Sequence, residues 1–345
     1  MIFFLSGGSE QDAVKSIKSG RYYLLLAGFQ NNAYAAATEV KAWADGKNIQ
    51  TQHYSMDEAG NNGALYNFAR ICAAYRQLQG RQAGLIGNVS HWLVASAFPL
   101  DLAKERFGIA IKHLHWGRLP DYLSFELDQE FLGLFESAGN EHLENEARVH
   151  SFLKMVLKEN QLDGITLECF DIVNDRAVTA CLALALLNSR GIVAGCEGDL
   201  VSLTGMMLVQ SLTGAIPWMA NIASVNNNSV LLAHCTAPLV LLNHYEVRTH
   251  FETGKSAAVQ GNLKMEEVTV FRLNQKLDKA FISHGKIVSQ PQHEFACRTQ
   301  SEIEMPAASV EKLRHYPLGN HHLIIPGNHA DLLRWACWYK QIEIA

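Results

Sequence analysis

A turn near the middle of the chain carries two carboxylates that could take part in catalysis. Glu197 and Asp199 lie in the stretch 195–199 (GCEGD), between a β-branched apolar run and an apolar stretch of helical character. The glycines allow a tight turn at the carboxyl end of a strand, where open α/β sheets bind ligands. The structural alternative is that Asp199 caps the helix and Glu197 is solvated. The turn alone does not separate these two interpretations.

Histidines in the C-terminal third could complete a site with these carboxylates. His234 ends an apolar run, and His321 and His322 lie in a glycine-led turn before another apolar run. A single histidine at a strand end is more often structural than a ligand. One carboxylate and two imidazoles, with an amide oxygen such as that of Asn221, would nevertheless form the mixed ligand set that Mn²⁺ or a similar divalent cation accepts.

The first two thirds of the chain alternate between short apolar runs and helical patterns. Strands are predicted at 2–5, 22–27, 49–54, 83–86, 107–111, 164–170 and 192–194, and helices at 9–17, 33–43, 66–78, 142–159, 177–187 and 200–212. This alternation of strands and helices predicts parallel sheets with helices on their faces.

After residue 216 the rhythm changes to short β-rich runs, at 230–233, 259–263, 268–273 and 285–288, with no long helix before 330–338. We therefore predict an α/β fold with two α/β (Rossmann-like) domains, 1–90 and 91–215, and a β-rich C-terminal domain, 216–345, with an antiparallel sheet or small barrel. The second domain would carry Glu197, and the third would carry His234 and His321.

Composition excludes several classes of protein. The chain has 345 residues, 48% of them hydrophobic, and a net charge of −5, without a Lys/Arg cluster that could follow a phosphate backbone. Its apolar runs are far shorter than the roughly 20 residues that a bilayer requires. Seven cysteines form no CxxC pair, which disfavours a zinc thiolate site or a disulfide scaffold. We expect a soluble, cytoplasmic protein that binds neither nucleic acid nor membranes.

Several segments resemble the L-fucose/L-arabinose isomerase superfamily, and most of all its short fucose-isomerase-like branch. They are 162–171 (LDGITLECFD), 181–187, 191–203 (GIVAGCEGDLVSL), 217–221 (PWMAN), 234–238 (HCTAP), 249–254 (THFETG), 297–300 (CRTQ) and 317–322 (PLGNHH). Their order and spacing carry the resemblance, which extends over most of the chain.

The resemblance implies an aldose-ketose isomerase that carries a divalent cation, usually Mn²⁺, and forms a homo-oligomer, a trimer or hexamer. Glu197 matches the family's first metal-binding carboxylate, which is also proposed to move the proton. His321 and His234 match metal-binding histidines of the family. The second carboxylate position falls on Asn221. An amide can coordinate a cation through its oxygen but cannot take a proton at neutral pH.

The expected reaction converts an open-chain monosaccharide through a cis-enediol, with Glu197 as metal ligand and candidate base. A second acid-base group must then be sought among Asp199, Glu168 and Asp171, and Asp199 is retained as a catalytic candidate. The predicted substrate-binding residues are Trp92, Glu168, His250, Glu252, Arg298, Asn320 and His322. Packing for Trp92 and ion pairing for the charged residues are the structural alternatives.

Two other functions stay open at this point. The first is a sugar-binding or regulatory protein that kept the fold and lost activity, since Asn221 stands where a carboxylate is expected. The second is a metal-dependent epimerase or lyase of a modified sugar. The sequence does not disclose which sugar is used.

Overall fold

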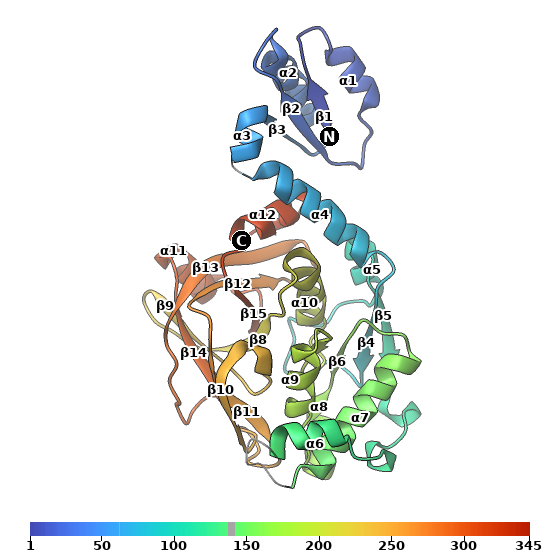
Figure 1. The fold of residues 1–345 in the computed structure, drawn as a ribbon, viewed down its shortest axis with the longest axis vertical. Helices are drawn as coiled ribbons and strands as arrows, with labels where there is room; N and C mark the ends of the chain where they lie inside the picture. Colours follow the sequence, from blue (N-terminus) through green and yellow to red (C-terminus); the bar gives the residue numbers. More distant parts are fainter. Residues whose placement is uncertain (62, 137–141) are drawn as a thin grey trace. The chain divides into compact units, whose positions relative to one another are not determined.

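The computed structural model describes residues 1–61, 63–136 and 142–345. The chain divides into two compact units (Figure 1): residues 1–73 with 338–340, and residues 74–337 with 341–345. The division into three domains at residues 90 and 215 stays a prediction. No helix in the described part of the chain is long and apolar enough to span a bilayer.

The first unit is built on a parallel sheet in the order β1-β2-β3: β1 (Ile2–Phe4), β2 (Tyr23–Ala27) and β3 (Thr51–Ser55). Its helices are α1 (Glu10–Ser16), α2 (Ala33–Gly46), α3 (Met56–Asn61) and the start of α4 (Ala64–Leu78). Buried alanines of α2, among them Ala33 and Ala37, pack with Phe4 and Leu25 of the sheet. Small side chains let the helix approach the sheet closely, so the alanine-rich stripe serves packing.

The second unit contains a four-stranded parallel sheet in the order β5-β4-β6-β7: β4 (Gln82–Ile86), β5 (Ala110–Leu114), β6 (Gly164–Leu167) and β7 (Val193–Gly195). The helices of this region are α5 (Asp101–Phe107), α6 (Gln129–Glu136), α7 (Glu144–Glu159), α8 (Cys169–Arg176), α9 (Cys181–Ser189) and α10 (Leu200–Thr213), with short 3₁₀ turns η1 (Trp116–Arg118) and η2 (Tyr122–Ser124). That the two parallel sheets form Rossmann-like domains stays a prediction.

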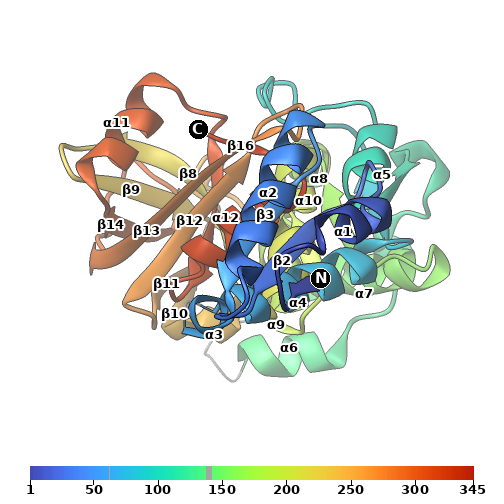
Figure 2. The ribbon, with the colours of Figure 1, turned by 90° about the horizontal axis from the view of Figure 1, so that it is seen from above.

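A closed six-stranded antiparallel barrel forms the C-terminal region, so the β-rich prediction is confirmed. Its strands are β8 (Trp218–Val225), β9 (Ser229–His234), β12 (Glu267–Leu273), β13 (Lys279–Ser289), β14 (Thr299–Glu304) and β15 (His321–Pro326). They follow the order β12-β15-β8-β9-β14-β13, and β13 pairs again with β12. Strands β8, β9, β12, β13 and β14 gather on one side of this unit in Figure 2.

The remaining elements are two antiparallel strands, a short parallel strand and two helices. β10 (Leu242–Arg248) and β11 (Ala258–Leu263) form a separate antiparallel pair after the turn η3 (Leu239–Leu241), and β16 (Glu343–Ile344) pairs with β13 in parallel. The helices α11 (Ala307–His315) and α12 (Ala330–Tyr339) complete the chain.

Helix α10 links the parallel sheet to the barrel. It packs against β6 and β7 on one side and against β12 and β15 on the other, and Figure 1 shows it between these two parts of the unit. Most of its residues are buried, which explains why its sequence is apolar around the whole helix. The carboxyl end of β7, where α10 begins, is thereby held near the barrel.

Several local boundaries differ from the prediction, and two of them have a clear cause. The strand expected at 107–111 lies at Ala110–Leu114, because Phe107 is buried at the end of α5 and Gly108 terminates that helix with φ +83°. The strand expected at 164–170 ends at Leu167, since Cys169 already begins α8. Helices α3, α5, α6, α8 and α11 were not predicted.

Candidate metal centre

Three side chains from separate elements converge in the second unit. Glu197 follows β7, His234 ends β9 and His321 begins β15, and one ligand atom from each lies within 4.8 Å of the others. Oε1 of Glu197 is 3.5 Å from Nε2 of His321 and 3.8 Å from Nε2 of His234. The barrel register explains this convergence: His321 lies opposite Asn221, which lies opposite Ala233, the neighbour of His234.

Each imidazole is held through Nδ1 and directs Nε2 toward Glu197. Nδ1 of His321 lies 2.9 Å from Oδ2 of Asp199, and Nδ1 of His234 lies 2.8 Å from Oγ1 of Thr236. Both Nε2 atoms are buried and have no hydrogen-bond partner among the described residues. Unpartnered buried nitrogens whose other ring nitrogen is fixed are typical of metal-binding histidines.

The donor set fits a divalent cation. Metal bonds of about 2.0–2.2 Å to imidazole nitrogen and carboxylate oxygen require donors roughly 3–4 Å apart. The separations of 3.5 and 3.8 Å around Oε1 of Glu197 lie in this range. One oxygen and two nitrogen donors form the mixed set that Mn²⁺ and similar ions accept.

The charges of the three residues are strongly coupled. Burial by itself would raise the pKa of Glu197, but His321 and His234 outweigh it and hold that pKa well below its usual range. Burial would lower the pKa of His321, yet the carboxylates of Glu197 and Asp199 raise it to about 9. Burial lowers the pKa of His234. A cation that binds here would therefore displace a proton from His321.

Backbone geometry presents Glu197 to the two histidines. Glu197 and Gly198 have positive φ angles of 59° and 68°. Gly198 donates its N–H to the carbonyl oxygen of Leu167 at 2.9 Å, and Ser90 donates its N–H to that of Glu197 at 3.0 Å. A Cβ atom on Gly198 would lie 2.1 Å from the carbonyl oxygen of Asn88. Only glycine fits this position of the turn.

We expect Gly198→Ala to lower the free energy of unfolding by about 3–5 kcal/mol, because backbone strain adds to the overlap with Asn88. Gly214→Ala is the matched control, since Gly214 also has a positive φ (72°) but no atom within 4 Å of its virtual Cβ. That control should lose about 1 kcal/mol. Urea unfolding of both variants measures the difference, and equal losses would contradict the tight fit of the turn.

Asp199 lies behind His321, in the interior of the unit. It caps α10 by accepting the N–H of Ser202 at 2.7 Å, and its Oδ2 also accepts from the hydroxyls of Ser202 at 2.9 Å and Ser96 at 3.1 Å. Arg272 lies 3.6 Å away. Burial opposes ionisation, but His321 and Arg272 lower the pKa of Asp199 to about 2. Asp199 is thus both the helix cap and the partner that orients His321.

Arg272 is a member of this arrangement that sequence reasoning missed. It is 2% exposed, and its guanidinium donates to the carbonyl oxygen of His321 and to the hydroxyl of Ser96. Gly319 makes room for it, since a Cβ there would lie 2.1 Å from the guanidinium. The signal available in the sequence was an arginine inside the apolar run 268–273 (VTVFRL).

A cavity of about 260 Å³, here called the site cavity, opens beside Glu197, whereas His234 and His321 are outside its described lining. Its lining consists of Trp92, Glu197, Asn221, Ala223, Ala233, Phe251, Glu252, Phe295, Ala296, Cys297 and Asn320. Aromatic walls and a few polar groups are typical of small-molecule sites.

Trp92, Asn320 and Asn221 lie in this lining. Trp92 donates from Nε1 to Oε2 of Glu197 at 2.6 Å, and its ring packs edge-on against Phe170. Trp92 is 43% exposed. Nδ2 of Asn320 donates to Oδ1 of Asn221 at 2.5 Å. The amide oxygen of Asn221 therefore already has a partner.

The turn 249–254 contributes Glu252 to the lining. Burial raises the pKa of Glu252, and the nearby charge of Glu197 raises it further. His250 lies outside the described lining, bonded through Nδ1 to Oγ1 of Thr253 at 3.1 Å, and burial lowers its pKa to about 4. Arg298 is also outside the described lining, and it donates from Nε to the carbonyl oxygen of Thr249 at the start of the turn.

His322 and Glu168 likewise lie outside the described lining of the site cavity. His322 is fully buried; its Nδ1 lies 3.0 Å from the carbonyl oxygen of Asn320, and burial lowers its pKa to about 3. Glu168 precedes α8 and accepts the N–H of Asn88 at 2.6 Å. Both have structural partners in their own surroundings.

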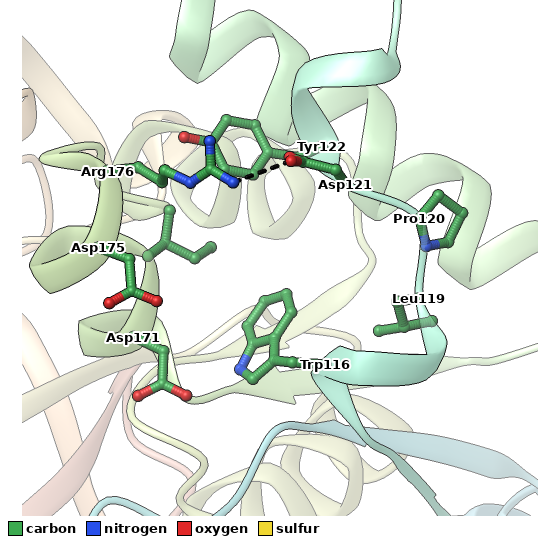
Figure 3. Close-up of a pocket in the computed structure, with 9 residues that line it drawn as sticks. Trp116, Leu119, Pro120, Asp121, Tyr122, Asp171, Asp175 and Arg176 are labelled. Carbon is green, nitrogen blue, oxygen red and sulfur yellow. Dashed lines mark hydrogen bonds and ion pairs between the residues drawn. The ribbon is translucent and has the colours of Figure 1, made fainter.

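Asp171 faces a different cavity, of about 280 Å³, which Figure 3 shows between α8 and the 116–122 segment. Trp116 and Tyr122 line it, and Arg176 pairs with Asp121 at 3.0 Å across its edge. The described lining of the site cavity therefore contains none of the three candidates Asp171, Glu168 and Asp199. The carboxylates that line it are Glu197 and Glu252.

Comparison with known proteins finds sugar isomerases. No family model matches the chain. It is 23% identical over 301 residues to a sulfoquinovose isomerase of Alkalicoccus urumqiensis, an alignment that covers 81% of this chain and 67% of that protein. It is 22% identical over 307 residues to a sulfoquinovose isomerase of Clostridium sp. (strain MSTE9), covering 81% and 66%. The chain thus spans about two thirds of the length of these curated relatives, and it is similar to both over most of its own length.

Proposed function

We propose that this chain is a sugar isomerase (EC 5.3.1.-) that interconverts an aldose and a ketose. The observation that carries the proposal is the convergence of Glu197, His234 and His321, of which Glu197 lines the site cavity. Similarity to two sulfoquinovose isomerases over 81% of the chain supports an isomerase of carbohydrate metabolism. From the resemblance we also propose a cytoplasmic homo-oligomer, a trimer or hexamer.

Glu197, His234 and His321 would hold the cation, Mn²⁺ or a similar divalent ion. When bound, it would stabilise negative charge on the two sugar oxygens during proton removal. Asn221 is a further proposed ligand, although its oxygen would have to leave the hydrogen bond from Asn320. Asp199 and Arg272 would orient His321.

In the proposed reaction, Glu197 removes the proton from C2 of the open-chain sugar and returns it to C1 through a cis-enediol. The N–H of Trp92 holds Oε2 of the same carboxylate, which fixes its direction. Asp199 is proposed as a positioning residue, because its oxygens already accept from the cap, Ser96 and His321.

Sugar contacts are proposed for Trp92, Glu252 and Asn320, which line the site cavity. Phe251 and Phe295 add apolar walls that reduce access of water. Arg298, His250, His322 and Glu168 are proposed to support the segments that carry these residues. The substrate is proposed to be a monosaccharide or a sugar derivative, and the relatives make sulfoquinovose the first compound to test.

Incubation of the purified chain with Mn²⁺ and a panel of aldoses in deuterated water tests this function. The panel includes sulfoquinovose, fucose and arabinose, and NMR follows the products. We expect one aldose to yield its ketose with solvent deuterium at C1, since a carboxylate that has taken the C2 proton exchanges it with solvent. Ligand binding without deuterium incorporation would instead indicate a sugar-binding protein, and an epimer or fragments would indicate the other enzyme classes.

A further inference from the structure

An aldose-ketose conversion requires two proton movements. The proton on C2 moves to C1, and the hydroxyl proton on O2 moves to O1. A carboxylate above the C1–C2 bond, as proposed for Glu197, serves the first movement. The second requires another group that can accept and return a proton, and the amide of Asn221 cannot do so at neutral pH.

The lining of the site cavity restricts which residue can be this second acid-base group. Besides Glu197, the carboxylate in this lining is Glu252. It reaches the cavity from the turn 249–254, which belongs to a segment different from the one that carries Glu197. Two carboxylates that enter one cavity from different segments can approach different atoms of the same sugar.

The turn that carries Glu252 is preorganised. His250 donates its N–H to the carbonyl oxygen of Lys255 at 2.9 Å, and Gly254 donates to that of His250 at 2.9 Å. Arg298 clamps the start of the turn, donating from Nε to the carbonyl oxygen of Thr249 at 2.6 Å. The backbone that carries Glu252 is therefore held in place before a substrate binds.

The same turn is anchored to the metal centre. Phe251 and Cys297 both pack against a buried cluster that contains Cys235. Cys235 directly follows His234, and Cys297 lines the site cavity. The position of Glu252 is therefore tied to the strand end that carries one of the proposed metal ligands.

We propose that Glu252 is the second acid-base group, which moves the hydroxyl proton between O2 and O1. In the aldose-to-ketose direction Glu197 takes the C2 proton while the electron pair of the C2–H bond forms the C1–C2 double bond and the C1–O1 double bond opens, leaving its electron pair on O1. Glu252 accepts the O2 proton as the C2–O2 double bond forms and Glu197 returns its proton to C1. Glu252 then protonates O1, so both carboxylates end as they began. This inference rests on the proposed isomerase function.

Glu252→Gln provides the test, because glutamine keeps the size and shape of the side chain but cannot carry a proton. The substrate is the aldose of the panel that the unaltered chain isomerises, with Mn²⁺ in deuterated water. We expect the kcat for ketose formation to fall by about 10²–10⁴-fold, with KM and metal content nearly unchanged. Exchange of deuterium into C2 of recovered aldose should fall much less, since Glu197 is intact.

Two further variants distinguish proton transfer from structural support. Glu252→Asp keeps a carboxylate and should recover part of the kcat. Glu246→Gln makes the same charge change at an exposed residue of β10 and should behave like the unaltered chain.

The inference is overturned if Glu252→Gln forms ketose within about threefold of the unaltered chain, or if it loses C2 exchange as completely as ketose formation. Absence of both ketose formation and C2 exchange in the unaltered chain would contradict the proposed function itself. An active unaltered chain with an active Glu252→Gln variant contradicts only the role of Glu252.

Discussion

Glu197→Gln is expected to lower isomerase turnover by at least about 10³-fold and to deplete the bound divalent cation. The carboxylate supplies the negative oxygen that lies 3.5 and 3.8 Å from the two imidazoles, and it is the proposed base at C2. Glutamine is neutral and accepts no proton, so both contributions are lost together. Turnover by NMR and metal content by elemental analysis measure the two effects.

Glu246→Gln is the control for this change as well, since Glu246 is exposed on β10 near Arg248. Its turnover and metal content should equal those of the unaltered chain. A Glu197→Gln variant that keeps both at the unaltered level would refute the assignment of Glu197.

Asp199→Asn is expected to lower the free energy of unfolding by about 3–5 kcal/mol, because it leaves the buried charge of Arg272 without its carboxylate. Arg272 is 2% exposed and lies 3.6 Å from Asp199, so water cannot replace the lost partner. The same change loosens His321, whose Nδ1 depends on Asp199. We therefore expect the affinity for Mn²⁺ to fall about 10–100-fold.

Ser202→Ala is the matched control for Asp199→Asn. It removes one hydroxyl donor to Asp199 but leaves the carboxylate, the backbone cap, His321 and Arg272 in place. A loss of about 1 kcal/mol and an unchanged Mn²⁺ affinity are expected. Denaturant unfolding and metal titration provide the measurements. Equal behaviour of the two variants would show that the carboxylate of Asp199 does not support the metal centre.

Glu197, His234 and His321, three of the four residues that the sequence nominated as metal ligands, converge in the structure. Glu197 follows a β-branched strand, His234 ends an apolar run and His321 begins one, and such ends of strands are visible in local patterning. The spacing of apolar residues and the positions of turn-forming residues are properties of the local sequence. The strands around these positions were predictable for this reason. The β-rich nature of the last third followed from the same patterns.

The position of the second acid-base group could not be derived in the same way. Asp199, Glu168 and Asp171 were the candidates that the sequence offered for this role. Burial behind His321 removes Asp199 from the lining of the site cavity, and Asp171 faces another cavity. Glu252 enters the lining from a turn 55 residues beyond Glu197, and only long-range packing decides which carboxylate reaches a given space.

The sequence by itself determined the types of the main elements, the turn that presents Glu197 and the histidines at two strand ends, because these depend on neighbours within a few residues. Tertiary structure decided that the β-rich part closes into a six-stranded barrel, since closure requires β13 to pair with both β12 and β14. It also decided that Asp199 and Arg272 stand behind His321 and that Glu252 shares the cavity of Glu197. These relations join residues from distant segments, and the physical reason is that barrel register and helix packing, rather than local preference, set the directions of their side chains.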